Sequence, residues 1–117
     1  MKILITLILF FISFITLSEE RYIEEFSNSQ LAVTTDTTQS MFQTLYNGTY
    51  KYSVVNDTES DTLIFKIKEG TKIFYHRILP GQAYNRTDIY WKTGTIFYVY
   101  YTETGGNIRG EVFRKQL

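Results

Sequence analysis

Short segments in which apolar and polar residues alternate set the main limit on how this chain can fold. Tyr50, Tyr52 and Val54 alternate with polar residues, and residues 62–68 repeat the pattern. A period of two places alternate side chains on opposite faces of a β-strand, so each segment is expected to bury one face and expose the other. The sequence therefore predicts antiparallel strands over this part of the chain.

Turn residues separate these segments at regular intervals. Gly70, Gly81 and Gly105 each follow a segment, and glycine accepts the positive φ that tight turns require. Further strands are expected at residues 73–79, 88–91, 95–102 and 108–114. The spacing predicts an all-β domain of about six to seven strands, as a small antiparallel β-sandwich or a partly closed barrel. Its size is immunoglobulin-like, but the Cys…Trp…Cys signature is absent because the chain has no cysteine.

Two of the expected strands are apolar on both faces. They are TIFYVYYT, at residues 95–102, and residues 73–79. We expect both at the centre of the fold, with one row of side chains in the core. The other row would be covered by the N-terminal segment, by the opposite layer or by something outside the chain. Alternatively it forms an aromatic binding face, because tyrosine rings can lie flat while their hydroxyls reach water.

The first residues have the pattern of a secretory signal peptide. Met1 and Lys2 precede an apolar run at residues 3–17, and Thr16 and Ser18 are small. As a helix the run would span about 22 Å, short of the roughly 30 Å hydrocarbon core of a bilayer. We predict a signal peptide at residues 1–18 and secretion of the mature protein, with a retained membrane anchor as the alternative.

The mature chain divides into two regions of different composition. Residues 19–45 begin with four glutamates, which suggest a short helix, and continue as a Ser/Thr-rich stretch. We expect a loosely held N-terminal arm there, with one short strand near residues 31–35. Residues 46–117 are the expected β-sandwich domain.

Charge and cysteine content exclude several classes of function. The formal net charge is 0, from 12 basic and 12 acidic residues, so we expect no nucleic-acid partner and no polybasic membrane anchor. The lack of cysteine excludes disulfides, Cys-ligated zinc and thiol catalysis. The domain must therefore be stabilised by packing, for which the chain supplies 10 tyrosines and one tryptophan.

No arrangement of residues predicts catalysis. His76 is the single histidine and lies in an expected strand, without a nucleophile in a suitable context. Asp57, Glu59 and Asp61 alternate as calcium ligands can, but the segment lacks the glycine and the terminal glutamate of a calcium loop. A solvated hairpin turn is the simpler interpretation. We expect no catalytic residue, no metal site and no cofactor, and hence no enzyme.

Three Asn-X-Thr sequons begin at Asn47, Asn56 and Asn85. Each falls in an expected turn or at a strand edge, where an oligosaccharide can be accommodated. We predict a glycoprotein, with ordinary turn asparagines as the alternative, which a bacterial source would favour.

Aromatic residues after the Pro-Gly turn form a candidate binding patch. Tyr84, Tyr90 and Trp91 are close in sequence, and Tyr101 lies in the next expected strand. Tyrosine and tryptophan offer large amphipathic contact areas at low entropic cost, so we predict a recognition module for a protein or glycan. In the alternative, Trp91 is an ordinary core residue.

Two other functions are compatible with the sequence. The loop at residues 79–82 is stiffened by Pro80 and Gly81, as in an inhibitor of an extracellular enzyme. Residues 29–44 alternate small polar and apolar residues, as a membrane-inserting hairpin would. Neither segment identifies a target, and the oligomeric state is open.

Overall fold

The computed structural model describes residues 21–116, which form eight β-strands and no helix. The strands are β1 (Arg21–Val33), β2 (Ser40–Gln43), β3 (Gly48–Asn56), β4 (Leu63–Glu69), β5 (Lys72–Ile78), β6 (Ala83–Trp91), β7 (Ile96–Tyr101) and β8 (Gly106–Gln116). The predicted signal peptide at residues 1–18 lies outside the described residues. Within the described range, no helix has the length and apolarity needed to cross a bilayer.

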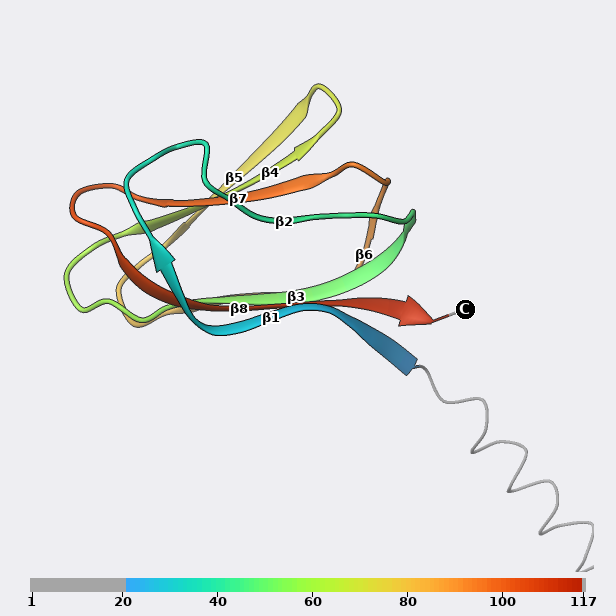
Figure 1. The fold of residues 1–117 in the computed structure, drawn as a ribbon, viewed down its shortest axis with the longest axis horizontal. Coiled ribbons are helices and arrows are strands. Elements are labelled where there is room, and N and C mark those ends of the chain that lie inside the picture. The colour runs from blue at the N-terminus through green and yellow to red at the C-terminus, as the bar shows by residue number, and fades with distance from the viewer. Residues whose placement is uncertain (1–20, 117) are drawn as a thin grey trace, which may run out of the picture.

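The strands form two four-stranded antiparallel sheets that pack face to face (Figure 1). Sheet A has the order β1-β8-β3-β6, and sheet B has the order β2-β7-β4-β5. Alternation gives each sheet an apolar face, and the two faces leave water together when the sheets pack. The predicted all-β sandwich is confirmed, with eight strands in place of six to seven.

The additional strands come from the segment that the sequence suggests is a loose arm. β1 pairs with β8 along most of its 13 residues, and β2 pairs with β7. The helix suggested by the glutamates is not formed in the described residues, because the chain is extended from Arg21 onward. Phe26 and Leu31 pack against the core, and Val33 is buried in it. A few apolar residues suffice because an edge strand in a sandwich buries only one face.

β4 and β5 are the only consecutive strands, among the eight described, that share a sheet. Gly70 closes their hairpin with a φ of 61°, as the sequence predicts. All other connections cross between the sheets, so the expected hairpin turn at residues 57–61 is wrong. Alternation reports which face of a strand is buried, but it does not report which strand lies beside it.

Aromatic rings fill much of the space between the sheets. The ring centre of Tyr52 lies 5.1 Å from that of Phe97 and 5.8 Å from that of Phe65. Phe65 and Phe97 meet edge to face at 5.6 Å. Such pairs contribute about 0.5–1.5 kcal/mol beyond the burial of their area. This packing stabilises a core that has no cysteine to cross-link it.

A buried polar network joins the two sheets. Asn56 is 0% exposed, and its Nδ2 donates hydrogen bonds to the carbonyl oxygens of Asp61 (2.8 Å) and Ile78 (3.0 Å). Its Oδ1 accepts hydrogen bonds from the Thr58 amide (3.0 Å), the Thr58 hydroxyl (2.7 Å) and the Tyr101 hydroxyl (2.8 Å). Asn56 ends a strand of sheet A, whereas Ile78 and Tyr101 end strands of sheet B. One side chain therefore ties the layers together.

The stretch TIFYVYYT contains β7, which lies at the centre of sheet B between β2 and β4, as predicted. Phe97 and Val99 belong to its buried row. The other row is half-buried on the outer face of sheet B, where the Lys66 ammonium lies 4.4 Å from the ring centre of Tyr98. At Tyr98, a side chain of the neighbouring strand β4 therefore supplies part of this cover.

β5 is an edge strand, so the expectation that residues 73–79 lie at the centre is wrong. Six of its seven residues are exposed. The exposed fractions of Ile73, Phe74 and Tyr75 are 47%, 49% and 63%. Apolar residues on both faces of this strand therefore do not indicate burial. They form a surface that the described chain leaves uncovered.

Candidate functional site

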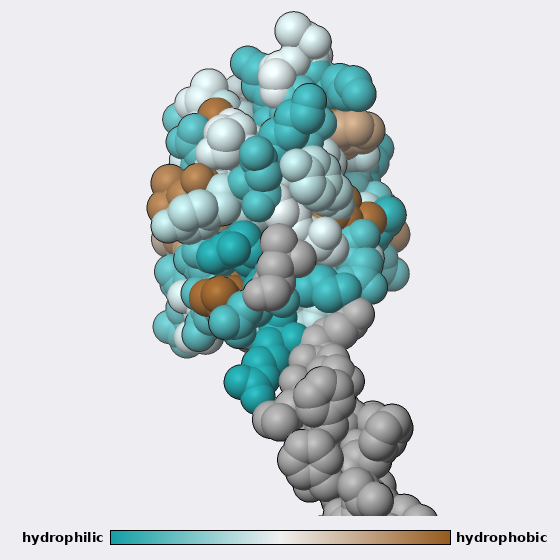
Figure 2. All heavy atoms as spheres, turned by 90° about the vertical axis from the view of Figure 1, so that its right-hand side faces the viewer, coloured by the Kyte–Doolittle hydropathy of each residue, from teal (hydrophilic) through white to brown (hydrophobic). Residues whose placement is uncertain are grey.

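A groove of about 420 Å³ opens on one side of the sandwich, between edge strands β5 and β6. Buried Tyr52 and Ile67 lie at its base. Its sides include Phe74, Tyr84, Arg86, Tyr90 and Trp91. We call this site the β5–β6 groove. On the side of the molecule seen in Figure 2, apolar residues form small separate patches among hydrophilic ones, so that side offers no broad apolar face.

A bulge in β6 shapes the groove. Between Arg86 and Ile89, β6 has two residues opposite one of β3. One of the two, Asp88, has a φ of 60°, and its Oδ1 accepts a hydrogen bond from the Tyr22 hydroxyl at 2.9 Å. Residues three positions apart face opposite sides of a regular strand. The bulge lets both Arg86 and Ile89 line the groove.

Aromatic side chains of the two edge strands meet across the groove. The rings of Phe74 and Trp91 lie edge to face, with centres 5.7 Å apart. The imidazole of His76 stacks on the ring of Tyr84 at 3.8 Å. β5 and β6 belong to different sheets, so only side chains join them here. These contacts can rearrange around a ligand without breaking backbone hydrogen bonds.

Trp91 carries a polar group without a partner. Its side chain is 7% exposed, and Nε1 is buried with no hydrogen-bond acceptor among the described residues. Burial raises the pKa of the Tyr52 hydroxyl to about 12, Tyr84 adds to the rise, and Arg86 and Trp91 oppose it. The Trp91 indole therefore lies near this hydroxyl without hydrogen-bond geometry. A buried N–H that makes no hydrogen bond costs about 1–3 kcal/mol, and a ligand acceptor would remove this cost once the side chains around Nε1 moved to expose it.

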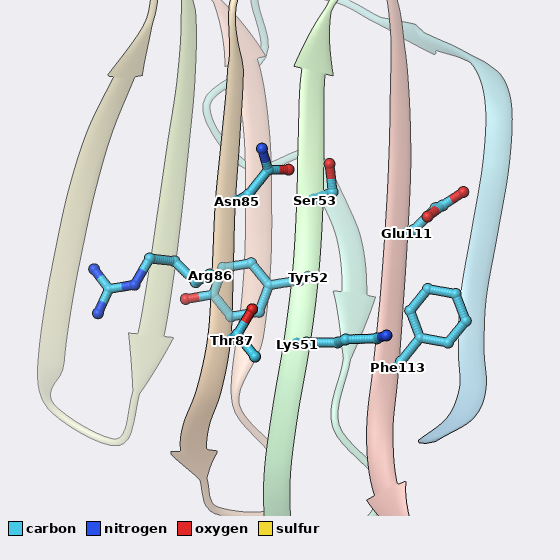
Figure 3. Close-up of a pocket in the computed structure, with 8 residues that line it drawn as sticks. All are labelled: Lys51, Tyr52, Ser53, Asn85, Arg86, Thr87, Glu111 and Phe113. Carbon is cyan, nitrogen blue, oxygen red and sulfur yellow. The ribbon is translucent and has the colours of Figure 1, made fainter. Parts of the chain in front are cut away.

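Basic side chains flank the groove. Lys72 and Arg86 are exposed, and Nη1 of Arg86 donates a hydrogen bond to the Tyr84 hydroxyl at 3.2 Å. Figure 3 shows Arg86 extending from β6 toward β5. Of the described residues that line the groove, Glu69 is the one acid, and its Oε2 accepts a hydrogen bond from the Lys92 amide at 3.1 Å. The groove therefore favours a ligand with negative charge or acceptor oxygens.

A second, smaller depression lies on the outer face of sheet A, beside the β6 bulge (Figure 3). It is lined mainly by polar side chains, with Phe113 at one side. Its lysine, Lys51, has its ammonium 4.2 Å from the ring centre of Tyr22 and 5.1 Å from that of Phe113. This cation already has aromatic partners, so we regard the β5–β6 groove as the better candidate.

The structure brings together three of the four residues of the predicted patch. Tyr84, Tyr90 and Trp91 line the groove, and Tyr90 is 56% exposed. Tyr101 does not join them, because it is 1% exposed and its hydroxyl belongs to the Asn56 network. Tyr101 is buried because it belongs to the row of β7 side chains that point into the core.

Sequence reasoning missed Phe74, Lys72 and Arg86 as groove residues. The first two belong to β5, whose residues were expected at the centre of a sheet. Lys72 and Arg77 enclose the apolar part of this strand, and basic residues of this kind are typical of sheet edges. That signal could have placed β5 correctly, whereas the bulge that brings Ile89 to the same face as Arg86 has no comparable signal.

The three sequon asparagines lie in different surroundings. Asn47 and Asn85 are exposed. Asn56 is fully buried, and its Nδ2, the atom to which a glycan is attached, donates two hydrogen bonds within the fold. The folded domain leaves no space for an oligosaccharide at Asn56, so the expectation for this position is corrected.

The acids of residues 57–61 have separate roles. Asp57 forms an exposed ion pair with Arg109 at 3.0 Å. Asp61 Oδ2 accepts hydrogen bonds from the amides of residues 103–105 at 2.8–3.2 Å. Burial raises the pKa of the Asp61 carboxyl, but these amides and the Thr102 hydroxyl lower it further, so that the pKa lies below its usual range. Within residues 21–116, no group of three or more histidines and acids is placed to hold a metal ion.

The fold and the groove define a class: a small cysteine-free β-sandwich with an aromatic groove between two edge strands. The chain matches no protein-family model, no curated protein and no solved structure. Its function is therefore argued from the groove itself.

Proposed function

We propose that this protein is a non-enzymatic recognition module that binds its ligand in the β5–β6 groove. The observation that carries the proposal is the buried, unpartnered Nε1 of Trp91 in a groove with aromatic walls. Structural tryptophans usually satisfy this donor when they are buried. Among the described residues, no hydrogen bond joins His76 to a serine or an acid, and this supports recognition over catalysis.

The chemistry of the groove limits the ligand. Phe74, Tyr84 and Tyr90 offer ring surfaces, which suit apolar side chains or the flat faces of sugars. Arg86, Lys72 and the Trp91 N–H supply hydrogen-bond donors, and Glu69 is the one acid among the described lining residues. The ligand is therefore a segment of protein or glycan with acceptor oxygens, and negative charge strengthens its binding.

We also propose that the chain is secreted after residues 1–18 are removed, and that Asn47 and Asn85 carry glycans. The apolar run at residues 3–17 and the exposure of both asparagines support this. N-terminal sequencing of protein recovered from the medium, with and without enzymatic deglycosylation, tests both parts. A protein that begins at Met1 and stays with membranes would contradict secretion.

Binding in the groove can be tested with a matched pair of tyrosines. Tyr90 is 56% exposed at the groove, and Tyr46 is 54% exposed outside it. Immobilised wild-type protein, Tyr90→Ala and Tyr46→Ala would be compared on a glycan array and a library of extended peptides. Ligands that bind in the groove should lose at least about tenfold in affinity with Tyr90→Ala and keep it with Tyr46→Ala.

The single tryptophan provides a second measurement. Because the chain has one tryptophan, its fluorescence and its indole N–H resonance both report on the groove. A bound ligand should shift this resonance. Ligands that bind both tyrosine variants equally and leave the indole signal unchanged would show that recognition occurs elsewhere.

A further inference from the structure

β5 ends sheet B, so one side of its backbone has no neighbouring strand among the eight described. It pairs with β4 over seven consecutive residues without a shift in register. The hairpin that it forms with β4 projects from the body of the molecule (Figure 1). Its free edge is therefore straight and accessible.

The other three edge strands are irregular. β1 has two shifts in register, and β2 has one within only four residues. β6 has a bulge at which Asp88 takes a φ of 60°. Bulges and short lengths are the usual devices that prevent an edge from pairing with another chain. β5 lacks both and carries only Lys72 and Arg77 as edge charges, which disfavour a basic strand but not an acidic one.

The side chains of β5 also suit an interface. Ile73 and Tyr75 lie on the outer face and Phe74 on the groove face, and all three are about half exposed or more. A strand added to β5 would cover apolar surface on both sides of the sheet. Strand addition combines backbone hydrogen bonds with such side-chain contacts.

The charge of the β4–β5 hairpin indicates which kind of strand can pair with β5. Lys66, Lys68 and Arg77 lie on the outer face of sheet B, close to Ile73 and Tyr75. The described strands β4, β5 and β7 place no acidic residue on that face. A second copy would bring like charges together at a β5–β5 pair. An acidic strand would instead face complementary charge, which favours a partner of the opposite sign.

We propose that β5 accepts an extended segment of an acidic partner protein as an added strand of sheet B. Acidic residues of the segment face the outer side, beside Arg77 of β5, with Lys68 of β4 one strand further away. Its alternate, apolar residues face inward over the opening of the β5–β6 groove, beside Phe74. This second statement rests on the proposed function of the groove, whereas the strand pairing stands on β5 alone.

Synthetic peptides of the same length as β5 test the pairing. A peptide that alternates glutamate with valine should bind the full chain, whereas one that alternates lysine with valine should not. Binding should protect amides of β5 from hydrogen exchange, and it should weaken as salt is raised. Two further peptides would carry N-methyl groups on the odd-numbered or on the even-numbered amides. One of the two should bind more weakly than the other, because only one edge of the peptide forms hydrogen bonds with β5.

Charge reversal gives a matched control. Arg77→Glu should weaken the acidic peptide about fivefold or more. Arg21→Glu changes an exposed charge on β1, at the far edge of sheet A, and should leave the affinity unchanged. Equal loss with Arg21→Glu would show a nonspecific charge effect and overturn the choice of partner.

The outcomes separate the two proposals. Protection of β5 with no effect of Tyr90→Ala would support strand addition and contradict binding in the groove. Strand addition would be overturned if the β5 amides stayed unprotected and both methylated peptides bound as tightly as the unmethylated one, while Tyr90→Ala abolished binding. A stable dimer in sedimentation with protected β5 amides would show that a second copy is the occupant, and would overturn the acidic partner.

Discussion

Replacing Asn56 with alanine should cost this domain a large part of its stability. The substitution removes two hydrogen bonds from Nδ2 and three to Oδ1, all inside the fold. Three of the five partners keep an alternative: the Thr58 hydroxyl and the Asp61 carbonyl also bond to each other at 3.0 Å, and the Tyr101 hydroxyl lies 3.0 Å from the Asn107 carbonyl. The bonds to the Ile78 carbonyl and from the Thr58 amide have no such replacement, and a buried group left without its bond costs about 1–3 kcal/mol.

We therefore expect Asn56→Ala to lower the free energy of unfolding by about 3 kcal/mol, against a typical total of about 5–15 kcal/mol. Urea unfolding followed by far-ultraviolet circular dichroism measures this value, with protein made without glycosylation. Asn85→Ala removes an exposed asparagine and should change the free energy by less than about 0.5 kcal/mol.

Tyr101→Phe separates the network from the packing. It keeps a buried ring and removes only the hydroxyl, so about 1 kcal/mol should be lost. In the double variant the two losses should be less than additive, because both remove the same Asn56–Tyr101 bond. A loss below about 1 kcal/mol for Asn56→Ala, or full additivity, would refute the idea that Asn56 couples the sheets.

Three further changes have defined outcomes. The pKa of Asp61 in the folded state lies below its unfolded value of about 3.9, so the carboxylate stabilises the fold fully above that pH and less as the pH falls further. Between pH 5 and pH 3, the urea midpoint should therefore fall more steeply for the wild type than for Asp61→Asn. Gly105→Ala places a Cβ 2.8 Å from the Val33 carbonyl oxygen at a φ of 90°, and calorimetry should show a clear fall in Tm, of several degrees for a cost of about 1–2 kcal/mol or more. Trp91→Ala should lose about 3–5 kcal/mol because the ring packs on Phe74 and Phe97, whereas Trp91→Phe should fold stably and weaken ligand binding; an unchanged Tm for Trp91→Ala would contradict its place in the core.

The sequence predicted the class of fold because alternation is a local property. The ends of β3 and β4 were predicted to within a residue or two, because each strand has a row of alternate apolar side chains, starting at Tyr50 and at Leu63, that must be buried. Only the end of β1 was expected, as a short strand near residues 31–35, because the inward residues of β1 are sparse and its serines and asparagines resemble those of a loop. Which strands are neighbours depends on contacts far apart in the chain, so the pairing of β1 with β8 could not be read locally.

The candidate site could be predicted in part for the same reason. Tyr84, Tyr90 and Trp91 lie along one strand, so their closeness in sequence carries over to space. Phe74 meets Trp91 only because β5 and β6 end different sheets on the same side of the sandwich. Tyr101 was included in the candidate patch but is buried, because the sequence of an aromatic row is the same whether the row faces water or the core.

β8 lies between β1 and β3, although it is the last described strand to leave the ribosome. The full order of sheet A therefore requires residues 106–116, although sheet B and the β3–β6 pair contain no residue of β8. Pairing across such long separations is slow, with sandwich folds typically forming in milliseconds to seconds. β1, whose neighbour in the sheet is β8 alone, stays without a partner strand until the last described strand has been made.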